Sequence, residues 1–313
     1  MLVVYNTCGI KRDNTDWYIE SINSLLNQDF EGYRVVFSSC LNSPECFKEV
    51  YSTFKDKISY CYHTDPHTVN ITFNKAIQES VKHFGEFEGY LYVDSGCSFE
   101  DQTNVISSVY ECFKSGPYGI VAVQTDTDEA LHVLDPDKFI YQTPEIQVKD
   151  EDYVVPIGKS INQHVHLFSN EIYKKYNKIH PDIFAAFCSE STFNYVAASV
   201  KQKWVIMKDL QVRHLHSLDG ASACASFVSE KHSNMWNNLL YDRDATEFVN
   251  DKEAYEAGLG YEECNNIMQH NPEAYDEDGY IKDPDRLTSV VNKYLFLSKE
   301  ELDYDEMRCK FIP

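Results

Sequence analysis

Short apolar segments alternate with amphipathic ones through the first hundred residues, and this alternation constrains the fold more than any other feature. Runs typical of strands occupy residues 2–5, 33–37, 58–62 and 89–93. Between them, apolar residues recur at helical spacing, as at Phe73 and Ile77. This β-α-β-α-β-α-β order predicts an α/β fold, with a mostly parallel sheet flanked by helices.

Polar residues follow three of the predicted strands. In sheets of this kind ligands bind at the carboxyl ends of the strands. That edge would carry the segments Asn6-Thr7, Ser38-Ser39 and Asp94-Ser95-Gly96. A carboxylate such as Asp94 can hold a hard divalent cation on a diphosphate, and small residues after it let phosphates approach the backbone. The alternative interpretation is an aspartate that caps the next turn.

The chain is predicted to divide near residue 220. We expect a domain at 1–220, with a nucleotide-binding half (1–100) and an acceptor half (101–220). Further strands are expected in it at residues 119–123, 164–168, 204–207 and 212–216. Residues 221–313 are expected to form an acidic helical extension, because 19 acidic and only 8 basic residues follow residue 240.

Composition excludes several classes of protein. The net charge of −22 repels bulk nucleic acid and anionic membranes. No apolar stretch approaches the ~18 residues of a membrane span, so no membrane partner is expected. The opening residues suit a strand rather than a signal peptide. The 10 cysteines form no CxxC pair, which favours reduced thiols and a cytoplasmic location.

Common catalytic and phosphate-binding motifs are missing from the sequence. It contains no GxGxxG, no GxxxxGK[ST], no GxSxG and no HExxH. The informative signals are instead a carboxylate at a strand end and two late histidines. His214 and His216 alternate on a predicted strand, so their imidazoles would share one side, and neutral imidazole is a good metal ligand.

Three other positions offer related chemistry. Asp126-Thr127-Asp128 is a literal DxD in a polar loop and a rival metal site. His164-Val165-His166 has the same alternation as the later pair, but no carboxylate site is evident near it. Glu190 lies at an expected helix start, where the helix dipole favours the ionised form that a general base requires. A capping role for Glu190 is the alternative.

Taken in chain order, these segments resemble the GT-A glycosyltransferases, close to family 2. The similar segments are residues 21–28 (SINSLLNQ, the first helix), 73–77 (FNKAI, the helix before the metal strand) and 90–94 (YLYVD, the strand ending in the DxD motif). Residues 187–191 lie where the family has its acidic catalytic motif. His214 and His216 lie where many members have a late histidine ligand. The sequence departs from the family in reading Asp94-Ser95-Gly96, without the second carboxylate.

The resemblance implies a metal-dependent hexosyl- or pentosyltransferase that uses a nucleotide-sugar donor, with a UDP-sugar favoured. It implies that the donor is bound by Asn6, Thr7, Ser39, Asn42, Asn74, Asp94 and Ser95. Asp94, with His214 or His216, would hold Mn²⁺ or Mg²⁺ on the diphosphate. Glu190 would deprotonate the acceptor hydroxyl, although a retaining mechanism stays open.

The acceptor and the function class have alternatives. A saccharide or small polar acceptor is expected. A hydroxymethylated base of viral DNA would need a basic groove, and its nominated residues are Lys201, Lys203, Lys208 and Arg213. A nucleotidyltransferase should have a basic, glycine-rich loop after the first strand, of which residues 8–12 (CGIKR) are only a faint version. A non-catalytic interaction module is the third class.

Overall fold

The computed structural model describes residues 1–8, 14–40, 42–64, 69–100, 102–125, 153–155, 164–181, 193–215, 276–277, 280, 282–294, 296 and 309–313. The strands are β1 (Leu2–Cys8), β2 (Arg34–Cys40), β3 (Ser59–His63), β4 (Gly89–Asp94), β5 (Cys97–Ser98), β6 (Tyr118–Thr125), β7 (Tyr153–Val155), β8 (Val165–Ser169), β9 (Lys203–His214) and β10 (Cys309–Ile312). The helices are α1 (Thr15–Leu26), α2 (Pro44–Phe54), η1 (Lys55–Lys57, 3-10), α3 (Val69–Phe84), α4 (Val105–Ser115), α6 (Asn170–Tyr176), α7 (Phe193–Ser199) and α13 (Pro284–Tyr294). None of these helices is long and apolar enough to cross a bilayer.

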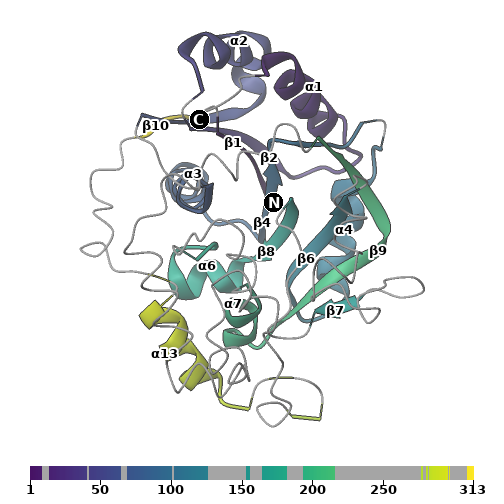
Figure 1. Cartoon of the computed structure of the whole chain (residues 1–313), viewed down its shortest axis with the longest axis vertical. Helices are drawn as coiled ribbons and strands as arrows, with labels where there is room; N and C mark the ends of the chain where they lie inside the picture. The colour runs from purple at the N-terminus through teal and green to yellow at the C-terminus, as the bar shows by residue number, and fades with distance from the viewer. Residues whose placement is uncertain are drawn as a thin grey trace, which may run out of the picture.

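One mixed sheet organises the molecule (Figure 1). Its strand order is β10-β3-β2-β1-β4-β8-β6-β9-β5, and β7 pairs with β9. The strands β3, β2, β1 and β4 are parallel, whereas β8 runs antiparallel to both of its neighbours, β4 and β6. The predicted α/β class, with a mostly parallel sheet flanked by helices, is therefore confirmed.

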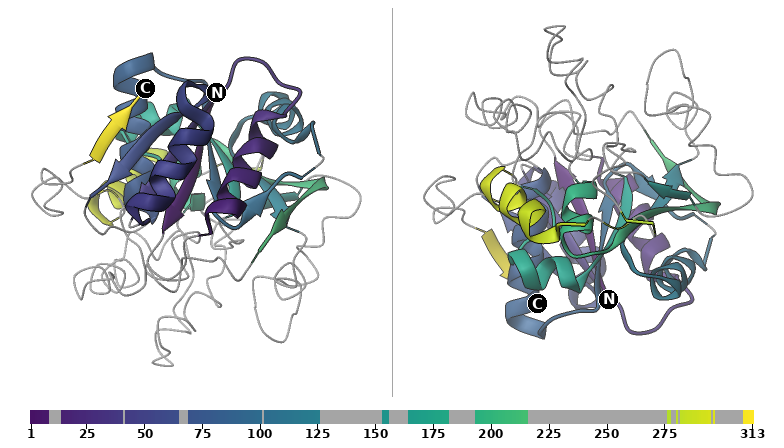
Figure 2. Two further views of the ribbon diagram at one scale, coloured as in Figure 1. Left: turned by 90° about the horizontal axis from the view of Figure 1, so that it is seen from above. Right: turned by 90° about the horizontal axis from the view of Figure 1, so that it is seen from below.

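Helices cover both faces of the sheet (Figures 1 and 2). Because side chains alternate along a strand, Val4 enters the core beneath α3, α7 and α13, while Val3 and Tyr5 enter the core beneath α1, α2 and α4. The central strands are buried on both faces, which explains their nearly continuous apolar sequences.

Local signals in the sequence place several helix starts correctly. The side chain of Asn14 accepts a hydrogen bond from the backbone N–H of Trp17 and so caps α1. Ser43 caps α2 in the same way, and Pro44 occupies its first turn. The sequence also predicts helix caps at Thr68 and Ser189, and both residues lie outside the described part of the chain.

Two segments differ from the sequence prediction. The expected strands at 204–207 and 212–216 are one long strand, β9, whose pairing with β6 shifts register between Ala122 and Gln124. The polar residues between the two stretches made β9 look like two strands in the sequence.

Two described elements of the last quarter of the chain pack against the main domain. Strand β10 pairs antiparallel with β3 at the edge of the sheet. Helix α13 lies against α7, and its Leu287 and Val291 join the core (Figure 2). The boundary at residue 220 stays a prediction, since most of residues 221–313 lie outside the described part.

Candidate metal and nucleotide site

The predicted polar segments meet at one edge of the sheet. Asn6 of β1 is in register with Ser38 of β2 on one side and with Asp94 of β4 on the other. All three strands are parallel, so this edge carries their carboxyl ends, where ligands bind in open α/β sheets.

Hydrogen bonds orient the carboxylate of Asp94 and fix its backbone. The Tyr92 hydroxyl donates to Oδ2 (3.1 Å), and the backbone N–H of Gly96 donates to Oδ1 (2.9 Å). The backbone N–H of Asp94 donates to the carbonyl of His164 (2.8 Å). The carboxylate is only 13% exposed, so it is presented to the edge of the sheet without being freely solvated.

His214 lies beside this carboxylate. Its Nε2 is 3.9 Å from Oδ1 of Asp94, and its side chain is fully buried. The residue ends β9 and is paired with Cys97 of the short strand β5. The expected proximity of Asp94 and one late histidine is therefore present in the fold.

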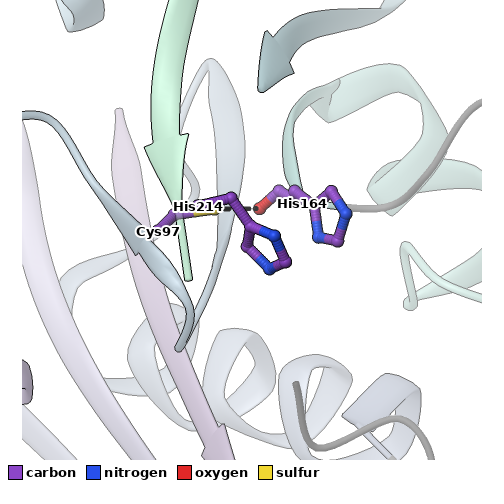
Figure 3. Close-up of side chains that lie close together, drawn as sticks. All are labelled: Cys97, His164 and His214. Carbon is purple, nitrogen blue, oxygen red and sulfur yellow. Dashed lines mark hydrogen bonds between the residues drawn. The ribbon is translucent and has the colours of Figure 1, made fainter. Parts of the chain in front are cut away.

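Two further potential ligands adjoin His214: His164, which the sequence analysis discounted, and Cys97, which it missed. The metal-ligating atoms of Cys97, His164 and His214 all lie within 4.8 Å of one another (Figure 3). The imidazoles of His164 and His214 have centroids 3.8 Å apart and planes inclined by 32°. The Cys97 Sγ lies 3.8 Å from the carbonyl oxygen of His164. We call these three residues the Cys-His-His cluster.

The reason given for discounting His164, that no carboxylate lies near it, was wrong. Strand β8 runs antiparallel to β4. Its beginning therefore lies beside the end of β4, where Asp94 stands. Alternation along the sequence could mark His164, but only the strand pairing shows its neighbours. No sequence motif marked Cys97 as a potential ligand; the only indication was its position three residues after Asp94.

Position 96, where a DxD motif has its second carboxylate, has no room for a side chain. A Cβ built on Gly96 would lie 2.6 Å from Nε2 of His214 and 3.2 Å from the carbonyl of Leu215. The imidazole of His214 thus occupies the space that a side chain at position 96 would need. The absence of a carboxylate at position 96 and the presence of His214 are therefore linked, because both side chains would need the same space.

Buried polar side chains line the β1 and β2 part of this edge. Thr7 and Ser39 both donate to Oδ1 of Asn42, at 2.6 and 2.9 Å. The amide of Asn6 accepts from Thr72 (3.1 Å) and donates to the carbonyl of Val69 (3.0 Å). These bonds brace the turns after the strands and the start of α3. They group the predicted donor-binding residues, but whether those residues bind a donor stays a prediction.

Comparison with known proteins defines the fold. No protein-family model and no curated protein sequence matches the chain. Among solved structures, it is similar to the mannosyltransferase PcManGT from Pyrobaculum calidifontis in complex with GDP-Man and Mn²⁺, with a TM-score of 0.53 and 11% identity. The match covers 77% of this chain and 64% of that one. The chain has the GT-A type of glycosyltransferase fold.

Structures of S. aureus TarS 1-349 also match. Without ligand the TM-score is 0.49, with coverage of 68% of this chain and 59% of TarS. In complex with UDP it is 0.48, with coverage of 84% and 76%. Identity is 14% in both cases.

Within the GT-A fold, Asn74 and Ser95 have contacts that stabilise the chain. The Asn74 amide donates to the carbonyl of His180 (2.7 Å) and accepts from the backbone N–H groups of Ile179 and His180. The carbonyl of Ser95 accepts from the hydroxyl of Tyr5 (2.8 Å), whose pKa is raised well above its usual value by burial. Both residues hold loops near the site, and their role toward the donor stays a prediction.

Several predicted residues lie outside the described part of the chain. These are Glu190, His216, Asp126 and Asp128, together with the side chain of Lys208. Of the other nominated basic residues, Arg213 forms an ion pair with Glu100, and the Lys203 Nζ lies 4.4 Å from the ring centroid of Tyr280.

Proposed function

We propose that this protein transfers a sugar from a nucleotide-sugar donor to an acceptor hydroxyl, with the help of a divalent cation. The observation that carries the proposal is the oriented carboxylate of Asp94, at the carboxyl end of a central parallel strand and 3.9 Å from an imidazole nitrogen. The GT-A fold supports this reading, and so does the similar PcManGT, whose structure contains GDP-Man and Mn²⁺.

The residues at this edge fit a divalent cation. Asp94 supplies a carboxylate and His214 an imidazole, and the close approach at Gly96 leaves His214 in the place of a second acid. A cation bound there would neutralise the charge that develops on the departing diphosphate. Tyr92 and the Gly96 N–H keep the Asp94 carboxylate directed by their hydrogen bonds, which limits reorganisation when a donor binds.

The nucleoside would lie over the neighbouring strand ends. Asn6 and Thr7 would contact it, with Ser39 and Asn42 beside them and Ser95 near the diphosphate. The hydrogen bonds among Thr7, Ser39 and Asn42 would keep this surface rigid in the absence of donor. Asn74 would act indirectly, by holding residues 179–180. A UDP-sugar is the donor we propose.

Glu190 is proposed as the general base that takes the proton of the acceptor hydroxyl as the bond to the sugar forms. The acceptor we propose is a saccharide or another small polar molecule. A DNA base is less well supported, because Arg213 of the nominated basic cluster is already paired with Glu100. A nucleotidyltransferase or a non-catalytic interaction module could have the same sheet, but neither would need Glu190 as a base for sugar transfer.

The proposal is tested by incubating the protein with UDP- and GDP-sugars, a divalent cation and a panel of saccharide acceptors. Release of nucleoside diphosphate and formation of the glycoside are measured. Glu190→Gln keeps the size of the side chain but removes the base. It should slow transfer by about 10²–10⁴-fold while leaving donor affinity nearly unchanged.

Two results would contradict these assignments. Near wild-type transfer by a folded Glu190→Gln variant would contradict the assignment of Glu190 as the general base. Transfer of a nucleotidyl group instead of a sugar would favour the nucleotidyltransferase.

A further inference from the structure

We propose that the Cys-His-His cluster, with Asp94 on its open side, is a zinc site rather than a manganese or magnesium site. The inference rests on the proposed function for the role of Asp94, but the cluster itself stands on the observed positions of Cys97, His164 and His214.

The chemistry of the donor atoms separates these metals. Thiolate and imidazole ligands suit Zn²⁺, whereas Mg²⁺ and Mn²⁺ prefer carboxylate, carbonyl and water oxygens. The cluster offers one sulfur and two imidazoles, and Asp94 adds the one carboxylate beside it. A combination of sulfur and nitrogen from three different segments is unsuited to a hard cation and well suited to zinc.

The three side chains are already gathered to nearly the required size. Tetrahedral zinc, with bonds of about 2.0 Å to nitrogen and about 2.3 Å to sulfur, needs ligand atoms roughly 3.3–3.6 Å apart. The candidate atoms lie within 4.8 Å of one another, so small rotations of the side chains would close the site. Pairing of Cys97 with His214 across β5 and β9 fixes two of the three ligands on hydrogen-bonded backbone.

The environment suits a metal that is reached from one side. Cys97 and His214 are buried to about 1% exposure, whereas Asp94 is partly exposed. Oδ1 of Asp94 is 3.9 Å from Nε2 of His214, which places a fourth oxygen ligand on the side toward the strand ends. With Asp94 as the fourth ligand, the four protein side chains would complete the tetrahedral shell of zinc. Binding would release the thiol proton of Cys97 to solvent, since the thiolate is the ligand.

The inference is tested on the chain of residues 1–313, stripped of metal with a chelator and then titrated with Zn²⁺, Mn²⁺ or Co²⁺. We expect one equivalent of Zn²⁺ by elemental analysis and tighter binding of Zn²⁺ than of Mn²⁺. Cobalt should produce the charge-transfer absorption of a thiolate ligand. Cys97→Ser should abolish that absorption and weaken zinc binding by about tenfold or more.

Cys112→Ser is the matched control, because Cys112 is also a buried cysteine in the same core cluster as Cys97, but it lies on α4, outside the Cys-His-His cluster. It should keep both the absorption and the zinc affinity. His164→Gln provides a second variant, expected to weaken zinc binding while retaining the cobalt–thiolate absorption. Circular dichroism verifies that each variant is folded.

Failure of the inference and failure of the proposed function can be distinguished by titrating UDP into the same samples. UDP binding that requires Mn²⁺, in a folded protein that takes up no zinc, would overturn the zinc site and leave the transferase proposal standing. Zinc uptake lost in Cys97→Ser, without any UDP binding, would support the zinc site and contradict the transferase. Zinc affinity equal in wild type, Cys97→Ser and His164→Gln would also overturn the inference.

Discussion

Among the buried histidines that the structure describes, His164 and His214 form one pair and His166 and His180 another, and the neighbours of the two pairs differ in kind. The tilted rings of His164 and His214 lie against each other beside a thiol and a carboxylate. His166 and His180 lie instead among aromatic rings, and both contact Phe168 and Phe193. Although His164 and His166 are separated by a single residue, only His164 has the surroundings of a ligand. Histidine spacing along a strand therefore indicates a shared side but not a shared role.

The aromatic surroundings determine the charge state of the second pair. Burial lowers the pKa of His166 to about 3 and that of His180 well below its usual value. Both rings are therefore uncharged near neutral pH and pack among the aromatic side chains of the core. Neither nitrogen of His166 has a hydrogen-bond partner among the described residues, which agrees with a packing role.

The largest effect that tests the difference between the two histidine pairs is the loss of folding stability at low pH that His166 causes. Its folded-state pKa lies below the value of about 6.5 for an unfolded histidine, so the unfolded chain takes up a proton that the folded chain does not. The stability that the neutral His166 ring contributes is therefore fully present above pH ~6.5 and is lost as the pH falls toward 3. His166→Leu should reduce the proton uptake on unfolding near pH 5 by about one, as measured by denaturant unfolding at a series of pH values.

Phe168→Leu is the matched control, since it alters the same aromatic cluster without removing a titratable group. It should change the overall stability but leave the pH dependence as in wild type. A His166→Leu variant with an unchanged slope would show that the ring is protonated in the folded state. The distinction between the two histidine pairs would then fail.

A smaller effect tests the position of His214, one of the two histidines with the surroundings of a metal ligand. Gly96→Ala would force a Cβ to within 2.6 Å of Nε2 of His214, unless the ring shifts. Overpacking of this kind costs about 1–3 kcal/mol. In a His214→Ala background the cost should largely disappear, and a double-mutant cycle of unfolding free energies measures the difference. Additive effects of the two substitutions would show that the imidazole does not occupy the space at position 96.

The fold could be predicted from the sequence wherever structure is local. Strands β1 to β4 and the helices between them follow from short-range periodicity and from helix-start signals such as Asn14 and Pro44. The single strand β9 could not be predicted, because an irregularity in its pairing with β6 interrupts the apolar pattern. The edge strand β10 depends on pairing with residues about 250 positions earlier in the chain, and no local signal records that.

The site was predictable to the same extent. Asp94 and His214 could be named because strand ends and alternation are visible in the sequence. Cys97 was not named and His164 was discounted, since their proximity to Asp94 and His214 depends on the antiparallel pairing of β5 with β9 and of β8 with β4. The absence of a second acid at Gly96 looked like a lost ligand in the sequence, whereas the structure explains it by the position of His214.

The central claim, that Asp94 binds a donor through a divalent cation, is tested most directly by calorimetric titration of UDP. The metal-loaded protein should bind UDP, and chelation should abolish binding. Asp94→Asn should weaken UDP binding strongly, whereas Asp126→Asn, in the rival DxD, should do so less. Equal affinity with and without the cation would contradict the metal role, and a greater loss in Asp126→Asn would move the site to the later loop.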